Sequence, residues 1–397
     1  MNQKPKRIAS IDIFRALTML LMIWVNDFWT LENVPKWLKH ARAGEDFLGF
    51  SDLIFPWFLY IVGLSIPFAI ENRIRKGESK GLITYHIITR SVALLIMGVF
   101  HVNFESYGAE ATGISRAVYI ILCTAAFFMV WNRYPVATSW KKYLYPGLQF
   151  VGIAILVYLG IRYRSGGDPA LGMKTQWWGI LGLIGWTYLI AAPIYLFSRK
   201  WKYASLIVFV GFITLNVVAD LGYSYKIFAF QGNQWFVGNG SLHTLAFGGI
   251  LTSLLLMQFN SKGKYSNLYS ILLLSSLFFL SVGFILHKYI IISKISGTST
   301  WIMFSLSSAV FLYALLHWIV ETHDNAHWFN LIKTAGTATL TCYLVPYFYY
   351  NFRSILHIDF DGFIVTGAVG LIKSMAYAFI IVGLTWVLGK LKIQLKV

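Results

Sequence analysis

Long apolar runs separated by short polar stretches repeat along almost the whole chain. Each run is close to the ~20 residues that an α-helix needs to cross a ~30 Å hydrocarbon core. None shows the alternation over about ten residues that is typical of an outer-membrane strand. The pattern therefore predicts an all-α, polytopic helical membrane protein with about twelve transmembrane helices. The expected spans are 13–30, 52–70, 82–101, 113–131, 144–161, 178–198, 203–219, 241–259, 268–286, 301–320, 331–350 and 363–388.

Composition agrees with this class of protein. Of the 397 residues, 57% are hydrophobic and 12% are charged, whereas soluble proteins carry about 25% charged residues. The formal net charge is +17, but the basic residues lie in short loops between the apolar runs. Membrane topology explains that distribution better than nucleic acid does. The lipid bilayer is the expected environment, and no nucleic-acid partner is expected.

The distribution of Lys and Arg also predicts the orientation in the membrane. An even number of spans puts both termini on one side, and the loops on that side carry most of the basic residues, so both termini are expected in the cytoplasm. The longer loops 31–51, 162–177, 220–240 and 287–300 then face outward. Asp12 and Arg15 interrupt the first apolar run and no cleavage site closes it, which favours a first span over a signal peptide. Without a linker or a soluble segment, residues 1–397 are expected to form one transmembrane domain.

The first two spans carry polar residues that are costly at membrane depth, namely Asp12, Arg15, Asn26 and Asp52. The loop between these spans contains His40. Histidine suits proton transfer near neutral pH, and Asp52 could orient or charge it. Asn26 could donate a hydrogen bond to a developing oxyanion. The alternatives are a solvated loop histidine and an interhelical polar contact of the asparagine.

Further charged and aromatic residues are candidates for ligand contacts. Arg116 lies just inside the fourth span and must pair with an opposite charge or reach water. Asp52 or an anionic group of a substrate could be its partner. Arg90, in the third span, could join Arg15 and Asp12 around an anionic cofactor, although the latter two could form a purely structural ion pair. Trp301 belongs to a set of tryptophans near the outer boundary, where an aromatic belt and sugar stacking are both possible.

The sequence gives little support for a metal site or a disulfide bond. His323 and His327 have the i, i+4 spacing of metal ligands on a helix, with Asp324 between them, but no further ligand set stands out. No metal is expected. Cys123 and Cys342 fall inside apolar runs and are interpreted as small buried hydrophobic residues.

The opening hairpin resembles a known family. RIASIDIFRALTMLLMIWVN, then KH, then DLIFPWFLYIVGLSI is similar to the catalytic start of the heparan-α-glucosaminide N-acetyltransferase family and its bacterial relatives. Weaker similarities follow in the same order at GISRAVYIIL (113–122), STWIMFSLSSAVFLYALLHWIVE (299–321) and GTATLTCYLV (336–345). More distantly, Arg15 followed by Asn26 after ten residues resembles the Arg-x10-His motif of the acyltransferase-3 membrane family, with asparagine in place of histidine.

That resemblance implies an activity and site residues. Members carry acetyl from acetyl-CoA in the cytosol to the amino group of a terminal glucosamine on the other side of the membrane. The essential histidine of the first outer loop falls on His40, the asparagine of the first span on Asn26, and the aspartate of D-L-x-F-P on Asp52. Arg116 matches the arginine of a Q-R segment. The resemblance also implies a family core of ten helices, which is two fewer than the spans counted here. Residues 8–72 would form the catalytic hairpin, and residues 144–198 would form an extra helical hairpin outside the core.

Departures from the family pattern fall on the outer face. The loop after His40 is longer than usual, Ser115 replaces the glutamine before Arg116, and WFVGNGSLHT, with His243 as a possible substitute polar group, replaces D-P-E-G. These differences therefore bear on the identity of the acceptor more than on the type of reaction. N- and O-acylation, direct transfer and an acetyl-histidine intermediate all stay open, as does a homodimer.

Two hypotheses follow. The leading one is a transmembrane acyltransferase, suited to a bacterial inner membrane, that moves acetyl from cytosolic acetyl-CoA to an amine or hydroxyl of an extracytoplasmic sugar. His40, Asn26 and Asp52 would be catalytic. The residues expected at acetyl-CoA are Arg15, Arg90 and Asp12, and those expected at the acceptor are Arg116, His243 and Trp301. The alternative is a transporter or flippase for a sugar or lipid-linked intermediate, with charged residues lining a pathway.

Overall fold

The computed structural model describes residues 8–136, 140–223, 236–260 and 265–396. Within these ranges the regular secondary structure is helical, without strands. The helices are α1 (Ala9–Asn26), α2 (Ser51–Arg75), α3 (Lys80–Asn103), α4 (Ala109–Thr112), α5 (Arg116–Trp131), α6 (Lys141–Arg162), α7 (Gly179–Ser198), α8 (Ala204–Asp220), α10 (Ser241–Asn260), α11 (Tyr265–His287), α12 (Ser299–His317), α13 (Lys333–Thr337), α14 (Thr339–Ile355) and α15 (Gly367–Lys390). The all-α prediction is confirmed for this part of the chain.

Membrane-spanning helices account for most of the chain. In the described ranges, nine helices are long and apolar enough to cross a bilayer, namely α1, α2, α3, α6, α7, α10, α11, α12 and α15. The chain is thus a multi-pass membrane protein. Three of the predicted spans correspond to shorter helices, α5 with 16 residues and α8 and α14 with 17 each.

One predicted span is interrupted in the structure. The helix expected over 331–350 is divided into α13 and α14, because Ala338 between them has a non-helical backbone with φ −125° and ψ 43°. His323 and His327, which have the i, i+4 spacing of metal ligands on a helix, do not share a helix in the structure. A π-helical turn ends at Thr322, and Asp324 has a positive φ of 47°. Among the described residues, no group of three or more His, Cys, Asp or Glu side chains could hold a metal ion.

Packing divides the chain into two compact units. The first contains Met1–Val25, Val34–Ile88 and Trp186–Gly336. The second contains Asn26–Asn33, Thr89–Gly185 and Thr337–Val397. Each unit therefore combines segments that are far apart in the sequence.

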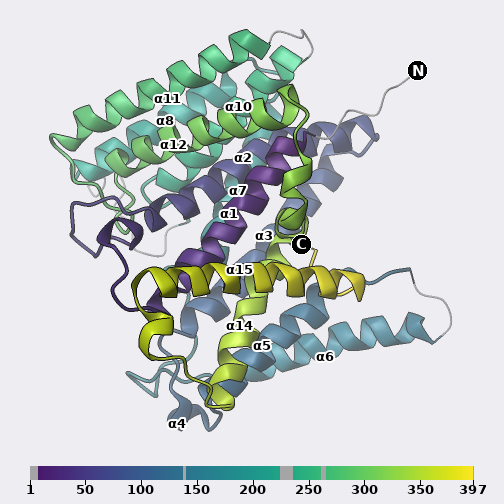
Figure 1. Ribbon diagram of the computed structural model, residues 1–397. Helices are drawn as coiled ribbons and strands as arrows, with labels where there is room; N and C mark the ends of the chain where they lie inside the picture. The colour runs from purple at the N-terminus through teal and green to yellow at the C-terminus, as the bar shows by residue number, and fades with distance from the viewer. Residues whose placement is uncertain (1–7, 137–139, 224–235, 261–264, 397) are drawn as a thin grey trace. The chain divides into compact units, whose positions relative to one another are not determined.

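In the first unit, α2 and α10 cross at backbone contact because their facing positions are glycines. A Cβ atom on Gly63 would lie 1.8 Å from the carbonyl oxygen of Ala246, and one on Gly249 would lie 2.0 Å from that of Tyr60. Small residues permit such close packing of membrane helices, where van der Waals contact replaces the hydrophobic driving force. The Tyr60 hydroxyl donates to Thr252 Oγ1 at 2.7 Å across the same crossing. Helices α8, α10, α11 and α12 lie alongside one another in this unit (Figure 1).

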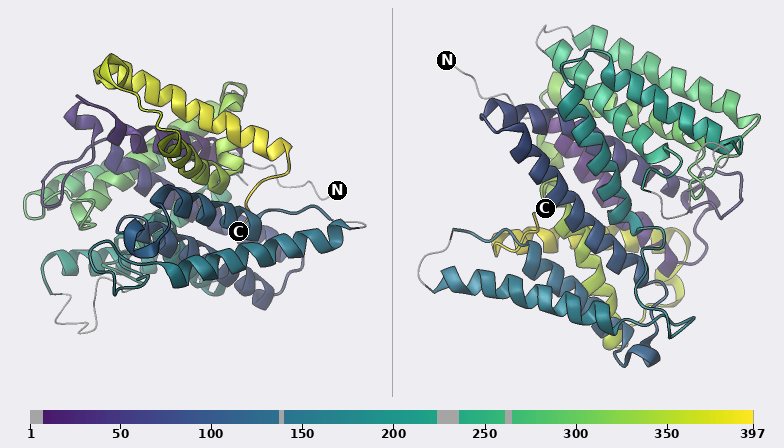
Figure 2. Two further views of the ribbon diagram at one scale, coloured as in Figure 1. Left: turned by 90° about the horizontal axis from the view of Figure 1, so that it is seen from below. Right: turned by 180° about the vertical axis from the view of Figure 1, so that it is seen from behind.

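In the second unit, α5 and α6 pack as a helical hairpin (Figure 2). The buried Tyr119 of α5 donates its hydroxyl hydrogen to the Leu159 carbonyl of α6 at 3.0 Å. Cys123 in α5 and Cys342 in α14 are free thiols and are fully buried. This agrees with the interpretation of both cysteines as small buried hydrophobic residues.

Candidate active site

The loop before α2 folds back onto the first turn of that helix. Asp52 lies in this turn, and its Oδ2 accepts hydrogen bonds from the backbone N–H groups of Ala41 at 2.9 Å and Gly49 at 3.2 Å. The Ser51 hydroxyl donates to the Leu38 carbonyl. A Cβ atom on Gly49 would lie 1.7 Å from the Lys39 carbonyl oxygen, so only glycine allows the loop to close this tightly. The loop and the helix start therefore form one structure around the Asp52 carboxylate.

A proline in α2 explains a second contact of Asp52. Pro56 has no N–H, so the carbonyl of Asp52, four residues earlier, lacks its intrahelical donor. The indole Nε1 of Trp301, at the start of α12, donates to that carbonyl oxygen at 3.2 Å. The Trp301 side chain is 1% exposed. The D-L-I-F-P sequence thereby connects the start of α2 to α12.

His40 makes a short hydrogen bond with this carboxylate. Its Nδ1 lies 2.7 Å from Asp52 Oδ1. An ionised carboxylate only accepts hydrogen bonds, so the contact requires the proton on Nδ1 and leaves the lone pair on Nε2. Asp52 is 1% exposed whereas the His40 side chain is 43% exposed. The pair therefore has a buried orienting group and a solvent-accessible base.

Lys294 is a third member of this cluster that sequence reasoning missed. It follows α11 in the 287–300 loop, and its Nζ lies 3.1 Å from His40 Nδ1 and 3.7 Å from Asp52 Oδ1. Burial lowers the pKa of Lys294, and the Asp52 carboxylate opposes that shift. The ammonium group compensates the charge of the buried Asp52. Sequence alone offered only a weak signal, one basic residue in a loop expected to face outward.

Asp46 joins the same two loops. Its carboxylate accepts from the Ile292 backbone N–H at 2.8 Å and lies 3.0 Å from His287 Nε2. The hydrogen bond from the Ile292 N–H lowers the pKa of Asp46, as does the neighbouring His287, although burial opposes them. This contact holds the loop that carries Lys294 against the loop that carries His40.

Asp12 and Arg15 form the ion pair that their spacing suggested. Arg15 NH1 lies 3.0 Å from Asp12 Oδ1 in α1, and Arg15 NH2 donates to Ser65 Oγ of α2 at 2.6 Å. Both charged side chains are about one-fifth exposed, with 23% for Arg15 and 20% for Asp12. This arrangement fits the structural interpretation of the pair.

The other candidates make different contacts or belong to the second unit. His243 is buried in α10 of the first unit and stacks on Phe212 with ring centroids 4.9 Å apart. In the second unit, Asn26 is the exposed last residue of α1, and Arg90 lies in α3. Arg116 donates to the Phe104 carbonyl, with its NH2 at 3.1 Å. Their roles in binding or catalysis stay predictions.

The second unit contains a buried charged residue that sequence reasoning also missed. Asp27, next to the exposed Asn26, is 1% exposed. It accepts from the Tyr350 hydroxyl at 2.7 Å and from the Ser374 hydroxyl, and it pairs with Lys373 Nζ at 3.0 Å. A second acidic residue at the end of the first apolar run was the available signal. Its donors come from positions more than 300 residues away, which no local pattern reveals.

Comparison with known proteins identifies the segment that carries His40 and Asp52. The family profile described as "Heparan-alpha-glucosaminide N-acetyltransferase, catalytic" matches residues 7–100. Residues 7–100 are therefore similar to the catalytic segment of that family. The heparan-alpha-glucosaminide N-acetyltransferase of Homo sapiens is 34% identical over 103 residues, which cover 25% of this chain and 14% of the human protein. The protein of the same name from Mus musculus is 34% identical over 106 residues, covering 26% and 15% of the two chains.

The similarity is confined to the start of the chain. The matched stretch spans about one-seventh of the length of these relatives, 14% and 15%. It contains α1, α2, the His40 loop and most of α3. The resemblance drawn from the opening hairpin is confirmed by these matches.

Proposed function

We propose that this protein is a transmembrane acetyltransferase that moves acetyl from cytosolic acetyl-CoA to an amine or hydroxyl of an extracytoplasmic, glucosamine-like sugar. The short hydrogen bond between His40 and Asp52, inside residues 7–100 that match the catalytic family, carries this proposal. Twelve spans with both termini in the cytoplasm would put the His40 loop on the outer face, and a bacterial inner membrane would suit that topology. Residues 1–397 would act as one domain, with 8–72 as the catalytic hairpin and 144–198 as an added one.

The geometry supports general base catalysis at His40. Nε2 would accept the proton of the acceptor amine or hydroxyl as the acceptor attacks the acetyl carbonyl carbon. The C–S bond of the thioester would then break, and the departing CoA thiolate would take the proton from the imidazolium. Asp52 would keep the proton on Nδ1 and stabilise the imidazolium. Asn26 would donate a hydrogen bond to the tetrahedral oxyanion.

Arginines and aromatic residues would bind the two substrates. Arg15, held in place by Asp12, and Arg90 would contact the phosphates of acetyl-CoA, because guanidinium groups recognise phosphate with paired N–H donors. Arg116 and His243 would contribute polar contacts for the acceptor. Trp301 is buried beneath Asp52, so it would act on acceptor binding mainly through the position of that residue.

Transfer across a sealed membrane tests the proposal directly. Purified protein in liposomes, with acetyl-CoA outside and a glucosamine-terminated oligosaccharide trapped inside, is expected to yield acetylated sugar inside and an equal amount of free CoA outside. Empty liposomes are the control. Passage of the sugar at the same rate without acetyl-CoA, or failure of the protein to bind acetyl-CoA, would contradict an acetyltransferase and support a transporter.

Lys294 is expected to stabilise the buried Asp52 carboxylate. Its Nζ lies 3.7 Å from Asp52 Oδ1, and Asp52 is 1% exposed. In Lys294→Met the carboxylate loses this positive charge, so the free energy of unfolding should fall by about 2 kcal/mol, and the transfer rate should fall with it. The measurements are thermal unfolding and the transfer rate. The exposed Lys288, in the same loop, provides the control variant Lys288→Met, and unchanged stability and transfer in Lys294→Met would refute this role.

A further inference from the structure

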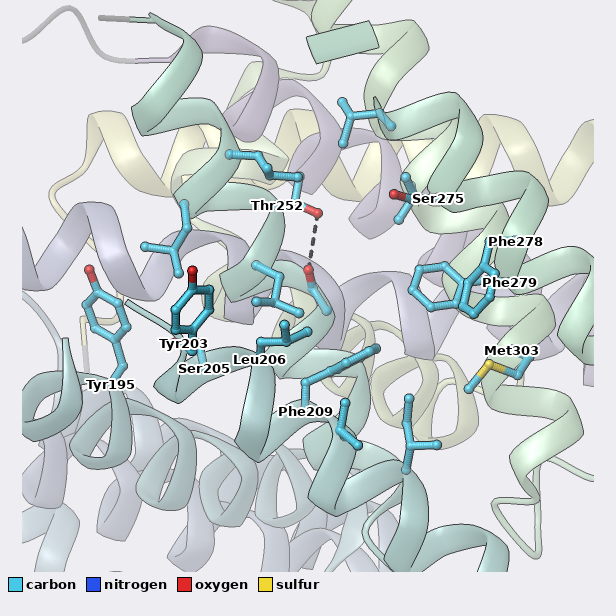
Figure 3. Close-up of a pocket in the computed structure, with 18 of the residues that line it drawn as sticks. Tyr195, Tyr203, Ser205, Leu206, Phe209, Thr252, Ser275, Phe278, Phe279 and Met303 are labelled. Atoms are coloured by element: carbon cyan, nitrogen blue, oxygen red, sulfur yellow. Dashed lines mark hydrogen bonds between the residues drawn. The ribbon is translucent and has the colours of Figure 1, made fainter. Parts of the chain in front are cut away.

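The first unit contains a cavity whose lining does not include His40, Asp52 or Lys294. Its volume is about 830 Å³, near the upper end of the ~300–1,000 Å³ of small-molecule sites. Helices α7, α8, α10, α11 and α12 supply its walls. In Figure 3, Leu206 and Phe209 of α8 lie on one side, with Phe278 and Phe279 of α11 and Met303 on the other.

The cavity has the shape of a groove parallel to its helices. On α8 the lining residues recur at Leu206, Phe209, Ile213 and Val217, the spacing of one helix face. On α11 one face lines the cavity from Leu272 to Leu286, a rise of about 21 Å. That length is a large part of the ~30 Å hydrocarbon core. The groove therefore suits a linear apolar molecule rather than a rounded one.

The groove opens between exposed apolar side chains. Leu206, Val210 and Phe278 are 47%, 51% and 62% exposed although they line the cavity. Fully apolar side chains at such an opening fit contact with hydrocarbon. Polar lining in the middle of the groove is limited to hydroxyls such as those of Thr252 and Ser275. Thr252 donates its hydroxyl hydrogen to the Gly248 carbonyl of its own helix at 3.1 Å.

One end of the groove differs in charge from the rest. Arg199, Trp201, Lys202 and Tyr203 line it there. Arg199 NH1 pairs with Glu71 at 2.8 Å, but its buried Nε has no hydrogen-bond partner among the described residues. Within the same part of the chain, no carboxylate lies within ion-pairing distance of Lys202, whose Nζ stacks 5.1 Å from the Tyr203 ring. An anion would compensate the charge of Lys202 and accept a hydrogen bond from the Nε–H of Arg199, and aromatic residues beside them are typical of the membrane interface.

We propose that this groove binds an anionic phospholipid, with one acyl chain between α8 and α11 and the phosphate at Lys202 and Arg199. The apolar stripe supplies affinity for the chain, and the basic end selects the headgroup. The site is independent of the acetyl transfer proposed above.

Photo-crosslinking in nanodiscs tests this proposal. Phosphatidylglycerol with a diazirine on one acyl chain is expected to label α8 and α11 within the groove about fivefold more than the matching phosphatidylcholine, because one basic residue at a membrane surface favours an anionic lipid by roughly that factor. Labelled peptides are located by mass spectrometry. Lys202→Gln should abolish the preference for phosphatidylglycerol, whereas Lys200→Gln, at an exposed neighbour outside the lining, should keep it.

A second pair of variants tests the position of the chain. Val210→Trp fills the groove and should lower labelling several-fold, while Leu274→Trp, at a 65% exposed residue of α11 outside the lining, should not. Equal labelling by the two lipids, or labels spread evenly onto the surface around Leu274, would overturn the proposal. Displacement of phosphatidylglycerol by an equimolar polyprenyl-phosphate sugar would also overturn it and would identify a lipid-linked glycan as the occupant.

Discussion

Replacing His40 by alanine is expected to lower acetyl transfer by ~10²–10⁴-fold, the usual contribution of a general base. The imidazole is the only group of the cluster with both a free lone pair and an accessible edge, since Asp52 is buried and Lys294 is cationic. The fold should persist, because the Asp52 carboxylate keeps its backbone donors from Ala41 and Gly49. Radiolabelled acetyl on the sugar and released CoA thiol measure the effect.

The control for this variant is His327→Ala, which removes an exposed histidine at the start of the 3-10 helix His327–Leu331. It should leave transfer unchanged. His40→Gln provides a second variant of similar size that cannot act as a base. Full activity in either His40 variant would contradict the catalytic role, and a burst of CoA equal to the amount of enzyme before acceptor addition, lost in His40→Gln, would indicate an acetyl-histidine intermediate.

Asp52→Asn is expected to reduce the rate by a comparable ~10²–10⁴-fold, although its shape changes little. An amide nitrogen beside His40 Nδ1 would require Nδ1 to accept a hydrogen bond, which moves the imidazole proton to Nε2 and removes the outward lone pair. The charge that stabilises the imidazolium is lost as well. Transfer rates and thermal unfolding of the purified variant, measured together, separate this effect from loss of fold.

The double variant His40→Ala with Asp52→Asn sharpens the test. If Asp52 acts through His40, the double variant should be no slower than His40→Ala alone, because residues that work as a unit are strongly non-additive. Asp359→Asn is a suitable control, since Asp359 is 90% exposed and pairs only with Arg353 among the described residues. A double variant with the product of the two single losses would refute the coupling.

Local patterns in the chain were enough to predict most of the helices. Apolar length and charge are properties of the neighbouring residues, so the spans of α2, α7 and α11 lie within a few residues of their predictions. The prediction for 331–350 missed the break at Ala338, because such a break in the backbone leaves hydropathy unchanged. The proximity of His40 and Asp52 could be anticipated, since a tight loop of eleven residues joins them.

What the sequence by itself determined is thus the class of protein, the approximate helices, and a histidine and an aspartate suited to acid–base chemistry. Only the tertiary structure decided what surrounds that pair. Lys294 and Trp301 come from about 250 residues further along the chain. The carbonyl freed by Pro56 and the charge of Asp52 each require a partner, but many donors in the sequence could have supplied one. Which donor does so depends on how α11 and α12 pack against α2, and long-range packing leaves no periodic trace in the sequence.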